Sequence, residues 1–255
     1  MKLTFLGTGT SQGVPVIACR CAVCQSGDWH DRHLRTSAII ETDEGKNILI
    51  DIGPDFREQM LREKVVHIDG ILITHAHRDH VGGLDDIRSF NYVQHKNMDL
   101  FCNHEARVTI ERDYHYIFEP HEFPGLPEAD MHELSGDDVF EVAGTCVMPI
   151  KAMHKTLPVL GYRIGRLAYI TDANHIAPQE LEKLDGVEVL VINALRKQKH
   201  FSHYCLPEAL EIVSQVKPRE AYLTHVSHEM GLYAEVSKEL PENVRLAYDG
   251  LKVSF

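Results

Sequence analysis

The hydrophobic positions of the chain occur mostly in short runs that suit β-strands. Runs rich in β-branched and aromatic residues predict strands at residues 2–6, 36–41, 47–52, 70–74, 99–102, 146–151, 161–164, 167–171, 187–192, 221–224 and 244–248. Helical spacing fits residues 54–64, 178–184, 207–216 and 232–240, and the first three of these segments have a proline at or near the first turn. Strands and helices therefore mix along the whole chain, as in an α/β (α+β) protein.

The segment 114–131 interrupts this alternation. It contains Pro120, Pro124, Gly125 and Pro127 with few regular apolar spacings, which predicts a long loop. Such loops often act as lids or substrate walls, and others only pack on the surface. No linker-like or low-complexity segment divides the chain, so we expect a single domain over residues 1–255.

The composition is that of an ordinary globular protein. With 255 residues and 44% hydrophobic residues, the chain can bury a sizeable core. No stretch approaches the roughly 18 apolar residues that a membrane helix needs, and the opening residues lack the long apolar region of a signal peptide. We therefore expect a cytoplasmic protein with no membrane partner.

The formal net charge is -12, which disfavours long nucleic acid as a partner because neutralising phosphates requires clustered Lys and Arg. A small anionic substrate remains compatible, since bound divalent ions would make the local field positive. The sequence leaves a homodimer open.

The residues HAHRDH at positions 75–80 directly follow an apolar run and contain four metal-binding side chains. His75 and His77 occupy alternate positions, so on an extended segment both imidazoles point the same way and can share one ion. Asp79 and His80 turn toward a neighbouring ion. This loop can therefore start a two-metal centre.

Further polar residues stand where predicted strands end, and ligands at strand ends converge at one edge of a sheet. The combined set would hold two ions: His75, His77 and His154 around one, Asp79, His80 and His225 around the other, Asp172 bridging both, and Asp51 orienting the ligands from behind. Two divalent ions about 3.5 to 4 Å apart activate a bridging water and clamp the oxygens of a displacement, which suits phosphate ester hydrolysis. Such ligands fit zinc, manganese or iron, and the sequence does not choose among them.

The HxHxDH motif resembles the signature of the metallo-β-lactamase superfamily. Asp51, His154, Asp172 and His225 match the remaining motifs of that family in order, over nearly the whole chain. The resemblance implies a four-layered αβ/βα sandwich with two facing mixed sheets and a dinuclear site at one edge. Because both Asp79 and Asp172 are present, the resemblance points to the dinuclear hydrolases and away from true β-lactamases, which typically bind the second metal differently.

A closer resemblance comes from the glycine-rich opening LGTGTSQGVP at residues 6–15 and the CxCxxC spacing of Cys19, Cys21 and Cys24. In a cytosolic chain this spacing favours metal ligation over disulfides. The combination resembles the phosphoribosyl cyclic-phosphate phosphodiesterase branch. In that branch the three cysteines and a histidine, here His228, hold a structural zinc, and three thiolates with one imidazole form a closed tetrahedral zinc set.

The branch also implies a function. We expect a metal-dependent phosphodiesterase that hydrolyses a small cyclic phosphodiester, such as a phosphoribosyl cyclic phosphate, with a metal-bridging hydroxide as nucleophile and two zinc or manganese ions. Asp79 and His203 are the predicted catalytic residues. His203 matches a general acid or phosphate-binding histidine, a role that suits the near-neutral pKa of histidine, although His200 lies only three residues earlier.

Other functions share parts of this pattern. The transfer-RNA maturation endonucleases have the dinuclear motifs but usually carry a basic arm, and no basic, glycine-rich insertion is visible here. A non-catalytic pyrroloquinoline-quinone carrier or biosynthesis protein resembles the chain in its CxCxxC loop, but departs from the full ligand set. Thioester hydrolases of the glyoxalase type are not expected to carry the cysteine zinc site.

Overall fold

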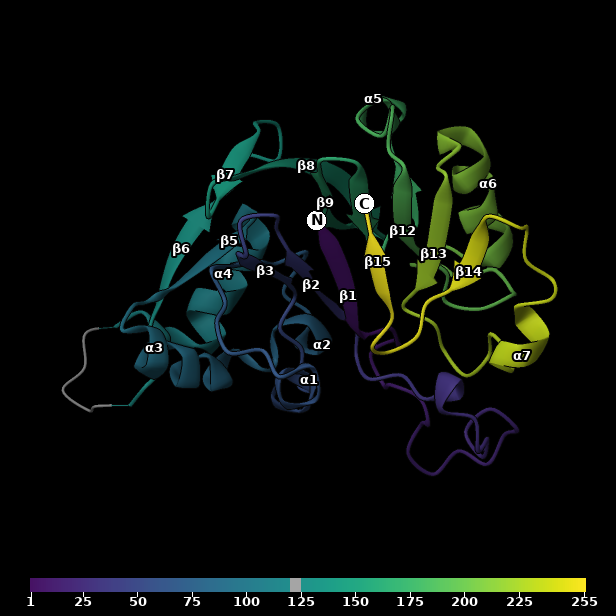
Figure 1. Cartoon of the computed structure of the whole chain (residues 1–255), viewed down its shortest axis with the longest axis horizontal. Helices are drawn as coiled ribbons and strands as arrows, with labels where there is room; N and C mark the ends of the chain where they lie inside the picture. Colours follow the sequence, from purple (N-terminus) through teal and green to yellow (C-terminus); the bar gives the residue numbers. More distant parts are fainter. Residues whose placement is uncertain (120–124) are drawn as a thin grey trace.

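The computed structural model describes residues 1–119 and 125–255. Within these residues the strands form one sheet of seven and one sheet of eight, which face each other with helices on both outer sides (Figure 1). This is the predicted arrangement of two facing mixed sheets, and the prediction is confirmed.

The first sheet has the order β15-β1-β2-β3-β4-β5-β6, and the pairing is antiparallel from β15 to β3 and parallel from β3 to β6. Its strands are β1 (Lys2–Gly7), β2 (Ser37–Glu41), β3 (Asn47–Ile50), β4 (Gly70–Leu72), β5 (Met98–Cys102), β6 (Ala129–Glu133) and β15 (Lys252–Ser254). The first and last strands of the chain therefore pair with each other, which places the two ends close together (Figure 1).

The second sheet has the order β11-β8-β9-β10-β12-β13-β14, with β7 paired to β8. It consists of β7 (Phe140–Val142), β8 (Thr145–His154), β9 (Leu157–Ile164), β10 (Leu167–Ile170), β11 (His175–Ile176), β12 (Val189–Asn193), β13 (Glu220–Thr224) and β14 (Val244–Leu246). The strands from β10 to β14 run parallel, so the residues that follow β10 and β13 emerge at the same edge.

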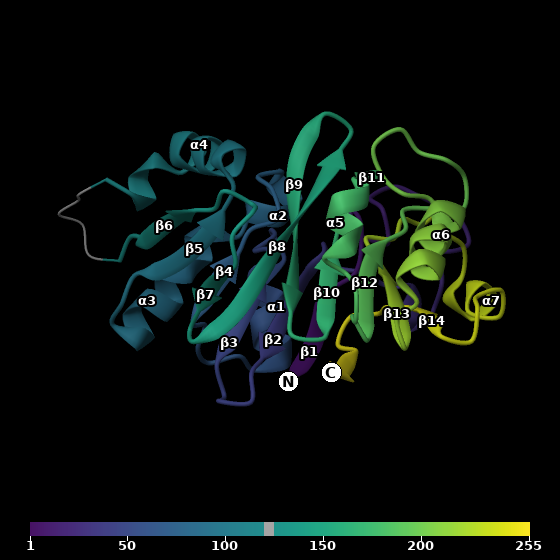
Figure 2. The same ribbon diagram turned by 90° about the horizontal axis from the view of Figure 1, so that it is seen from above.

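The helices form the two outer layers. Figure 2 shows α3 and α4 on one side of the molecule and α6 and α7 on the other. The α-helices are α1 (Phe56–Glu63), α2 (Arg78–Val81), α3 (Arg88–Gln94), α4 (His104–Asp113), α5 (Pro178–Glu182), α6 (Leu206–Val216) and α7 (Tyr233–Val236), and the short 3-10 helices are Trp29–Asp31, Leu84–Ile87 and His115–Ile117.

The alternation of side chains along β3 shows how the layers are filled. Ile48 and Ile50 are buried in the core between the two sheets, whereas Leu49 packs into the core between the first sheet and its helices. A strand that is covered on both faces reads as a continuous apolar run rather than as alternating apolar and polar positions. On the other side, Leu190 of β12 packs with Ala209 and Val213 of α6.

Several sequence predictions need correction. The segment 114–131 is not one loop, because residues His115–Ile117 form a 3-10 helix and β6 begins at Ala129; residues 120–124, with Pro120 and Pro124, lie outside the described residues. The helix expected at 232–240 extends only over Tyr233–Val236. None of the helices among the described residues is long and apolar enough to cross a membrane.

Candidate metal centre

The backbone at the ends of three strands takes an unusual conformation. Asp51 follows β3, Asp172 follows β10 and His225 follows β13, and their φ angles are 59°, 57° and 56°. Only a few per cent of residues other than glycine have a positive φ, and such strained positions gather at functional sites. Each strand therefore ends in a turn that directs a carboxylate or an imidazole out of the sheet.

The loop of residues 75–80 brings its side chains together in two directions. His75 is buried, and its Nε2 atom lies 3.0 Å from Nδ1 of His77. In the short helix α2, Nε2 of His80 lies 3.3 Å from Oδ2 of Asp79, and the His80 ring centroid lies 4.2 Å from that of His75. The division of the loop between two ions, with His75 and His77 on one and Asp79 and His80 on the other, stays a prediction.

The Asp172 carboxylate lies at the centre of the cluster. Its Oδ2 atom is 3.1 Å from Nε2 of His80, and its Oδ1 atom is 3.1 Å from Nε2 of His225 and 3.0 Å from Nε2 of His203. Thr171 donates a hydrogen bond to Oδ2 at 2.8 Å. A carboxylate with both oxygens directed at histidines has the position expected of a bridging ligand.

The Nδ1 atoms of His154 and His225 point away from the cluster, and their hydrogen bonds fix the orientation of the two imidazoles. Nδ1 of His154 donates to the carbonyl oxygen of Ser202 at 2.8 Å. Thr36 donates its hydroxyl proton to Gly9, so the same oxygen accepts from Nδ1 of His225, at 3.1 Å. Each bond leaves Nε2 of the ring free to face the cluster, which is how the surroundings of a metal site orient its histidines.

Burial and charge act in opposite directions on the ionisation of the cluster. Burial opposes the charged form of His80, but the carboxylates of Asp172, Asp51 and Asp79 outweigh it and hold the pKa of His80 well above its ordinary value. Burial lowers the pKa of His225 to about 4 and that of His75 well below its ordinary value. Burial also opposes the ionised form of Asp79 and Asp172, but neighbouring histidines outweigh it and lower the pKa of both, so these two carboxyl groups favour the ionised form, while His75 and His225 favour the neutral form; both are the forms that bind metal.

One buried atom tests whether the cluster fits metal ions. Nε2 of His80 is fully buried and meets no partner in hydrogen-bond geometry among the described residues, although two carboxylates lie within 3.3 Å. Unpaired buried nitrogens are costly, and an ion between this nitrogen and those carboxylates would satisfy it. Ligand atoms of three overlapping groups lie within 4.8 Å of one another: His75, His80 and Asp172; Asp79, His80 and His225; and His154, Asp172 and His203. The site is typical of a dinuclear metal centre of this fold.

His203 lies closer to the cluster than His200. Its Nε2 atom faces Asp172, while its Nδ1 atom lies 3.1 Å from Oγ of Ser202 and 3.2 Å from Nδ1 of His200. His200 therefore stands behind His203. Because His203 also falls into a group with metal-ligand spacing, it is a candidate ligand as well as a candidate general acid.

A second cluster joins the amino-terminal loop to the chain after β13. Nδ1 of His228 lies 3.3 Å from Sγ of both Cys19 and Cys21, and Cys24 completes the group. Hydrogen bonding from the Cys24 backbone and contact with His228 lower the pKa of the Cys21 thiol to about 6, whereas burial raises the pKa of Cys24 to about 11. Three sulfurs and one ring nitrogen at this spacing suggest a structural metal site, as expected from CxCxxC.

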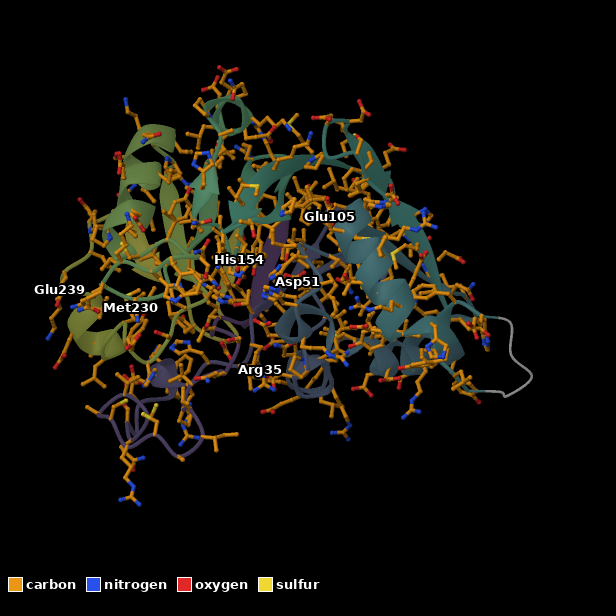
Figure 3. The ribbon with its side chains drawn as sticks, turned by 180° about the vertical axis from the view of Figure 1, so that it is seen from behind. Arg35, Asp51, Glu105, His154, Met230 and Glu239 are labelled. Atoms are coloured by element: carbon orange, nitrogen blue, oxygen red, sulfur yellow. The ribbon has the colours of Figure 1, made fainter. Side chains whose placement is uncertain are left out.

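The surroundings of the centre include residues that sequence reasoning missed. Thr36 and Ser202 orient histidines, and neither belongs to a recognisable motif. Beside Asp79 lies a cavity of about 550 Å³ that Arg35 and Arg78 also line. A larger cavity, about 590 Å³, lies between α1 and α3, and none of the predicted ligands is among its lining residues. Figure 3 shows Asp51 and His154 near the middle of the molecule, with Arg35 below them.

The chain is similar to known proteins in sequence and in structure, among them the following three. An octanoyltransferase of Porphyromonas gingivalis (strain ATCC BAA-308 / W83) is 42% identical over 253 residues, which cover 99% of this chain and 51% of the relative; the chain thus spans about half the length of that protein. The crystal structure of a new diphosphatase from the PhnP family is 38% identical, with a TM-score of 0.92, and covers 100% of this chain and 97% of that chain. Zinc-bound PqqB from Methylobacterium extorquens has the same fold, with 18% identity, a TM-score of 0.81 and full coverage of both chains.

A family model confirms the resemblance that the motifs indicate. The model of the beta-lactamase superfamily domain matches residues 46–226, a stretch that contains the HxHxDH loop and every other predicted ligand of the dinuclear centre. Together with the two facing sheets, this match shows that the chain belongs to the β-lactamase superfamily and has the metallo-β-lactamase fold.

Proposed function

We propose that the protein is a metal-dependent phosphodiesterase that hydrolyses a small cyclic phosphodiester, such as a phosphoribosyl cyclic phosphate. The observation that carries the proposal is the position of Asp172, whose two carboxylate oxygens lie within 3.1 Å of three histidines from separate segments of the chain. The similarity to a diphosphatase of the PhnP family supports phosphate chemistry in preference to β-lactam chemistry.

The ligand assignment is part of the proposal. His75, His77 and His154 would hold one ion, Asp79, His80 and His225 the other, and Asp172 would bridge them, while Asp51 fixes the His80 ring. A pair of zinc or manganese ions, when bound, supplies Lewis acidity and an activated water. The Cys19, Cys21, Cys24 and His228 set would hold a structural zinc.

The remaining chemistry belongs to side chains. His203 lies 3.0 Å from the central carboxylate, so it can reach a phosphate group bound at the cluster. We assign to His203 the role of general acid: its Nε2 atom donates a proton to the departing alkoxide. Histidine suits this role because its pKa lies near neutral pH and an alkoxide is a poor leaving group unless it is protonated. Ser202 and His200 contact its Nδ1 atom and hold the ring toward the cluster.

The alternatives fit less well. An endonuclease function is less well supported because the sequence contains no basic arm, and a net charge of -12 disfavours the binding of long RNA. The likeness to PqqB concerns the fold alone at 18% identity, whereas this chain has the full set of dinuclear ligands. The transferase name belongs to a relative about twice as long as this chain, and no residue of the cluster points to acyl transfer.

A substrate panel tests the proposal. Protein loaded with manganese or with zinc is assayed against cyclic phosphodiesters, linear phosphodiesters, precursor transfer RNA, β-lactams and acyl thioesters. We expect the highest kcat/KM for a cyclic phosphodiester. Absence of turnover of every phosphodiester by protein that holds two ions at the centre would reject the proposal, and turnover of transfer RNA or a thioester alone would favour the corresponding alternative.

A further inference from the structure

A groove with an apolar floor lies between α1 and α3, and none of the predicted metal ligands lines it. Both helices lie below the strands of the first sheet in Figure 1, and the groove measures about 590 Å³. Its floor consists of Phe56, Met60 and Phe90, which are buried in the core between the first sheet and its helices. The Phe56 and Phe90 ring centroids are 5.8 Å apart, so the two helices meet beneath the groove.

The walls of the groove expose large apolar side chains. Leu61, Val66 and Val93 line it and are 62%, 71% and 64% exposed. A single exposed apolar residue is ordinary on a protein surface, whereas several around one depression are typical of a site that another molecule covers. The groove therefore has the apolar floor and walls of a docking surface.

The border of the groove is basic. Arg57, Lys64 and Arg88 line it and are exposed, and within residues 1–119 and 125–255 none of these cations lies at ion-pair distance from a carboxylate. The same part of the chain contributes one carboxylate to the lining, that of Asp86. Because the chain as a whole carries a net charge of -12, the groove is opposite in sign to the rest of the protein. A partner with complementary charge is acidic.

We propose that this groove binds an amphipathic helix of another protein, with acidic residues on both sides of its apolar face. The basic border fixes the spacing. Arg57 and Lys64 are seven residues apart, which is two turns or about 10 Å along α1. Carboxylates at positions i and i+7 of a partner helix have the same separation, and apolar residues at i+3 and i+4 then face Met60 and Leu61.

A helix suits the walls better than an extended strand does. An added strand needs the free backbone N–H and C=O groups of a sheet edge. The groove lies between two helices, α1 and α3, whose backbone groups bond within each helix except at its ends, so the groove offers side chains and little free backbone. A helix satisfies its own backbone and presents only side chains in return.

The charges and the shape disfavour two other occupants. A second copy of the chain that docks by two-fold symmetry would place Arg57, Lys64 and Arg88 opposite the same three cations of its partner. A bilayer is flat and would cover the exposed walls without reaching the floor. The inference does not depend on the proposed hydrolytic function.

Two synthetic helical peptides, each about five turns long, test the inference. Both carry the same leucine stripe, and the positions beside the stripe hold glutamate in one peptide and lysine in the other. Fluorescence anisotropy of the labelled peptides measures Kd. We expect wild-type protein to bind the glutamate peptide about tenfold more tightly at low salt, because three exposed ion pairs together contribute about this factor. The difference should shrink at high salt.

A variant of the wall shows where the peptide binds. Leu61→Asp places a carboxylate on an exposed wall and leaves the floor intact, so it should weaken binding of the glutamate peptide about tenfold or more. Val108→Asp is the matched control, because Val108 lies on α4, is 50% exposed and does not line the groove. It should bind as the wild type does. Circular dichroism of both variants checks that the fold is kept.

A charge reversal tests the basic border. Arg57→Glu combined with Lys64→Glu should reverse the preference, so that the lysine peptide binds more tightly than the glutamate peptide. The control combines Arg166→Glu with Arg219→Glu, at two exposed arginines that both pair with Glu188. This control should keep the wild-type preference.

The outcomes that overturn the inference are distinct. One is equal affinity of wild-type protein for the two peptides, and another is equal affinity of Leu61→Asp and Val108→Asp for the glutamate peptide. Sedimentation velocity tests the second copy, and flotation with vesicles of phosphatidylcholine and phosphatidylglycerol tests the bilayer. A wild-type dimer, or vesicle binding, that Leu61→Asp abolishes and Val108→Asp keeps would assign the groove to that occupant instead.

Discussion

Nδ1 of His80 lies 2.7 Å from Oδ2 of Asp51, and both side chains are fully buried. The same carboxylate accepts hydrogen bonds from the backbone N–H and the hydroxyl of Thr74, each at 2.8 Å. The ring of His80 is therefore fixed with Nδ1 protonated, and Nε2 is directed at Asp79 and Asp172. Asp51 organises the centre without reaching its interior.

This relationship gives the first prediction. Asp51→Asn removes the charge that keeps Nδ1 of His80 protonated, and we expect the affinity of the dinuclear centre for manganese or zinc to fall by about 10–100-fold. Metal titration of the variant, followed by fluorescence of a competing chelator, measures this loss. Asp43→Asn, at an exposed carboxylate that pairs with the amino terminus, is the control. Wild-type affinity in Asp51→Asn would show that Asp51 does not orient a ligand.

The cysteine cluster gives the second prediction. Cys21→Ser should release one zinc per chain and lower the melting temperature, because the cluster joins the amino-terminal loop to His228. A domain of this size loses about 2–4 °C for each kcal/mol of stability. Plasma emission spectrometry measures the zinc content, and calorimetry measures the melting temperature. Cys146→Ser, at an exposed free cysteine, should change neither. An unchanged zinc content in Cys21→Ser contradicts the assignment.

The role assigned to His203 predicts a dependence on the leaving group. His203→Gln should lower kcat by about 10²–10⁴-fold for a substrate with an alkoxide leaving group. The loss should be much smaller for bis(p-nitrophenyl) phosphate, whose leaving group needs no proton. His200→Gln should have a smaller effect, since His200 contacts His203 and not Asp172. An equal loss on both substrates would instead assign His203 to metal or phosphate binding.

Acid stability gives the fourth prediction. His33 is buried beside Thr8, and because Thr8 donates its proton to Asp249, the Nδ1 of His33 must donate to Thr8 at 2.7 Å. Burial lowers the pKa of His33 from 6.5 to about 4. The neutral ring therefore stabilises the fold fully above pH 6.5, and this contribution is lost as the pH falls through the folded-state pKa near 4.

The measurement is urea unfolding of wild-type protein and His33→Asn at pH 7.5, 5.5 and 4.5. Asparagine keeps a donor near the Nδ1 position but does not titrate. We expect the wild type to lose more stability than the variant on acidification, by up to about 3 kcal/mol over the whole interval. Other buried histidines are present in both proteins, so their effects cancel in the difference. Parallel pH profiles would show that His33 does not titrate in this way.

Much of the fold could be predicted from the sequence, because its strands are buried on both faces. The strands β3 and β12 can be recognised from the sequence alone, since every position except Asn47 in β3 and Asn193 in β12 is apolar. Helix α4 was missed because Ala106 and Ile110 are its only fully buried residues, which is too few to produce a clear periodicity. Strand β6 was missed because its residues Ala129–Glu133 are mostly polar and form the edge of the sheet.

Some residues of the candidate site could likewise be predicted from the sequence, and others could not. The ligands near the HxHxDH loop and at strand ends could be predicted because chemistry restricts their residue types and the chain order follows a family pattern. Arg35 and Arg78 could not be predicted, since they come from separate segments and meet only at the cavity wall. The positive φ angles of Asp51, Asp172 and His225 also leave no local signal, because these residue types occur in ordinary turns as well.

The most direct test of the central proposal is the initial rate of cyclic phosphodiester hydrolysis as a function of the number of ions bound at the centre. Metal-free protein is titrated with manganese, and bound metal and rate are measured in the same samples. The proposal predicts no activity without metal and full activity when two ions per chain are bound in addition to the structural zinc. A chain that holds both ions and still hydrolyses no phosphodiester would contradict it.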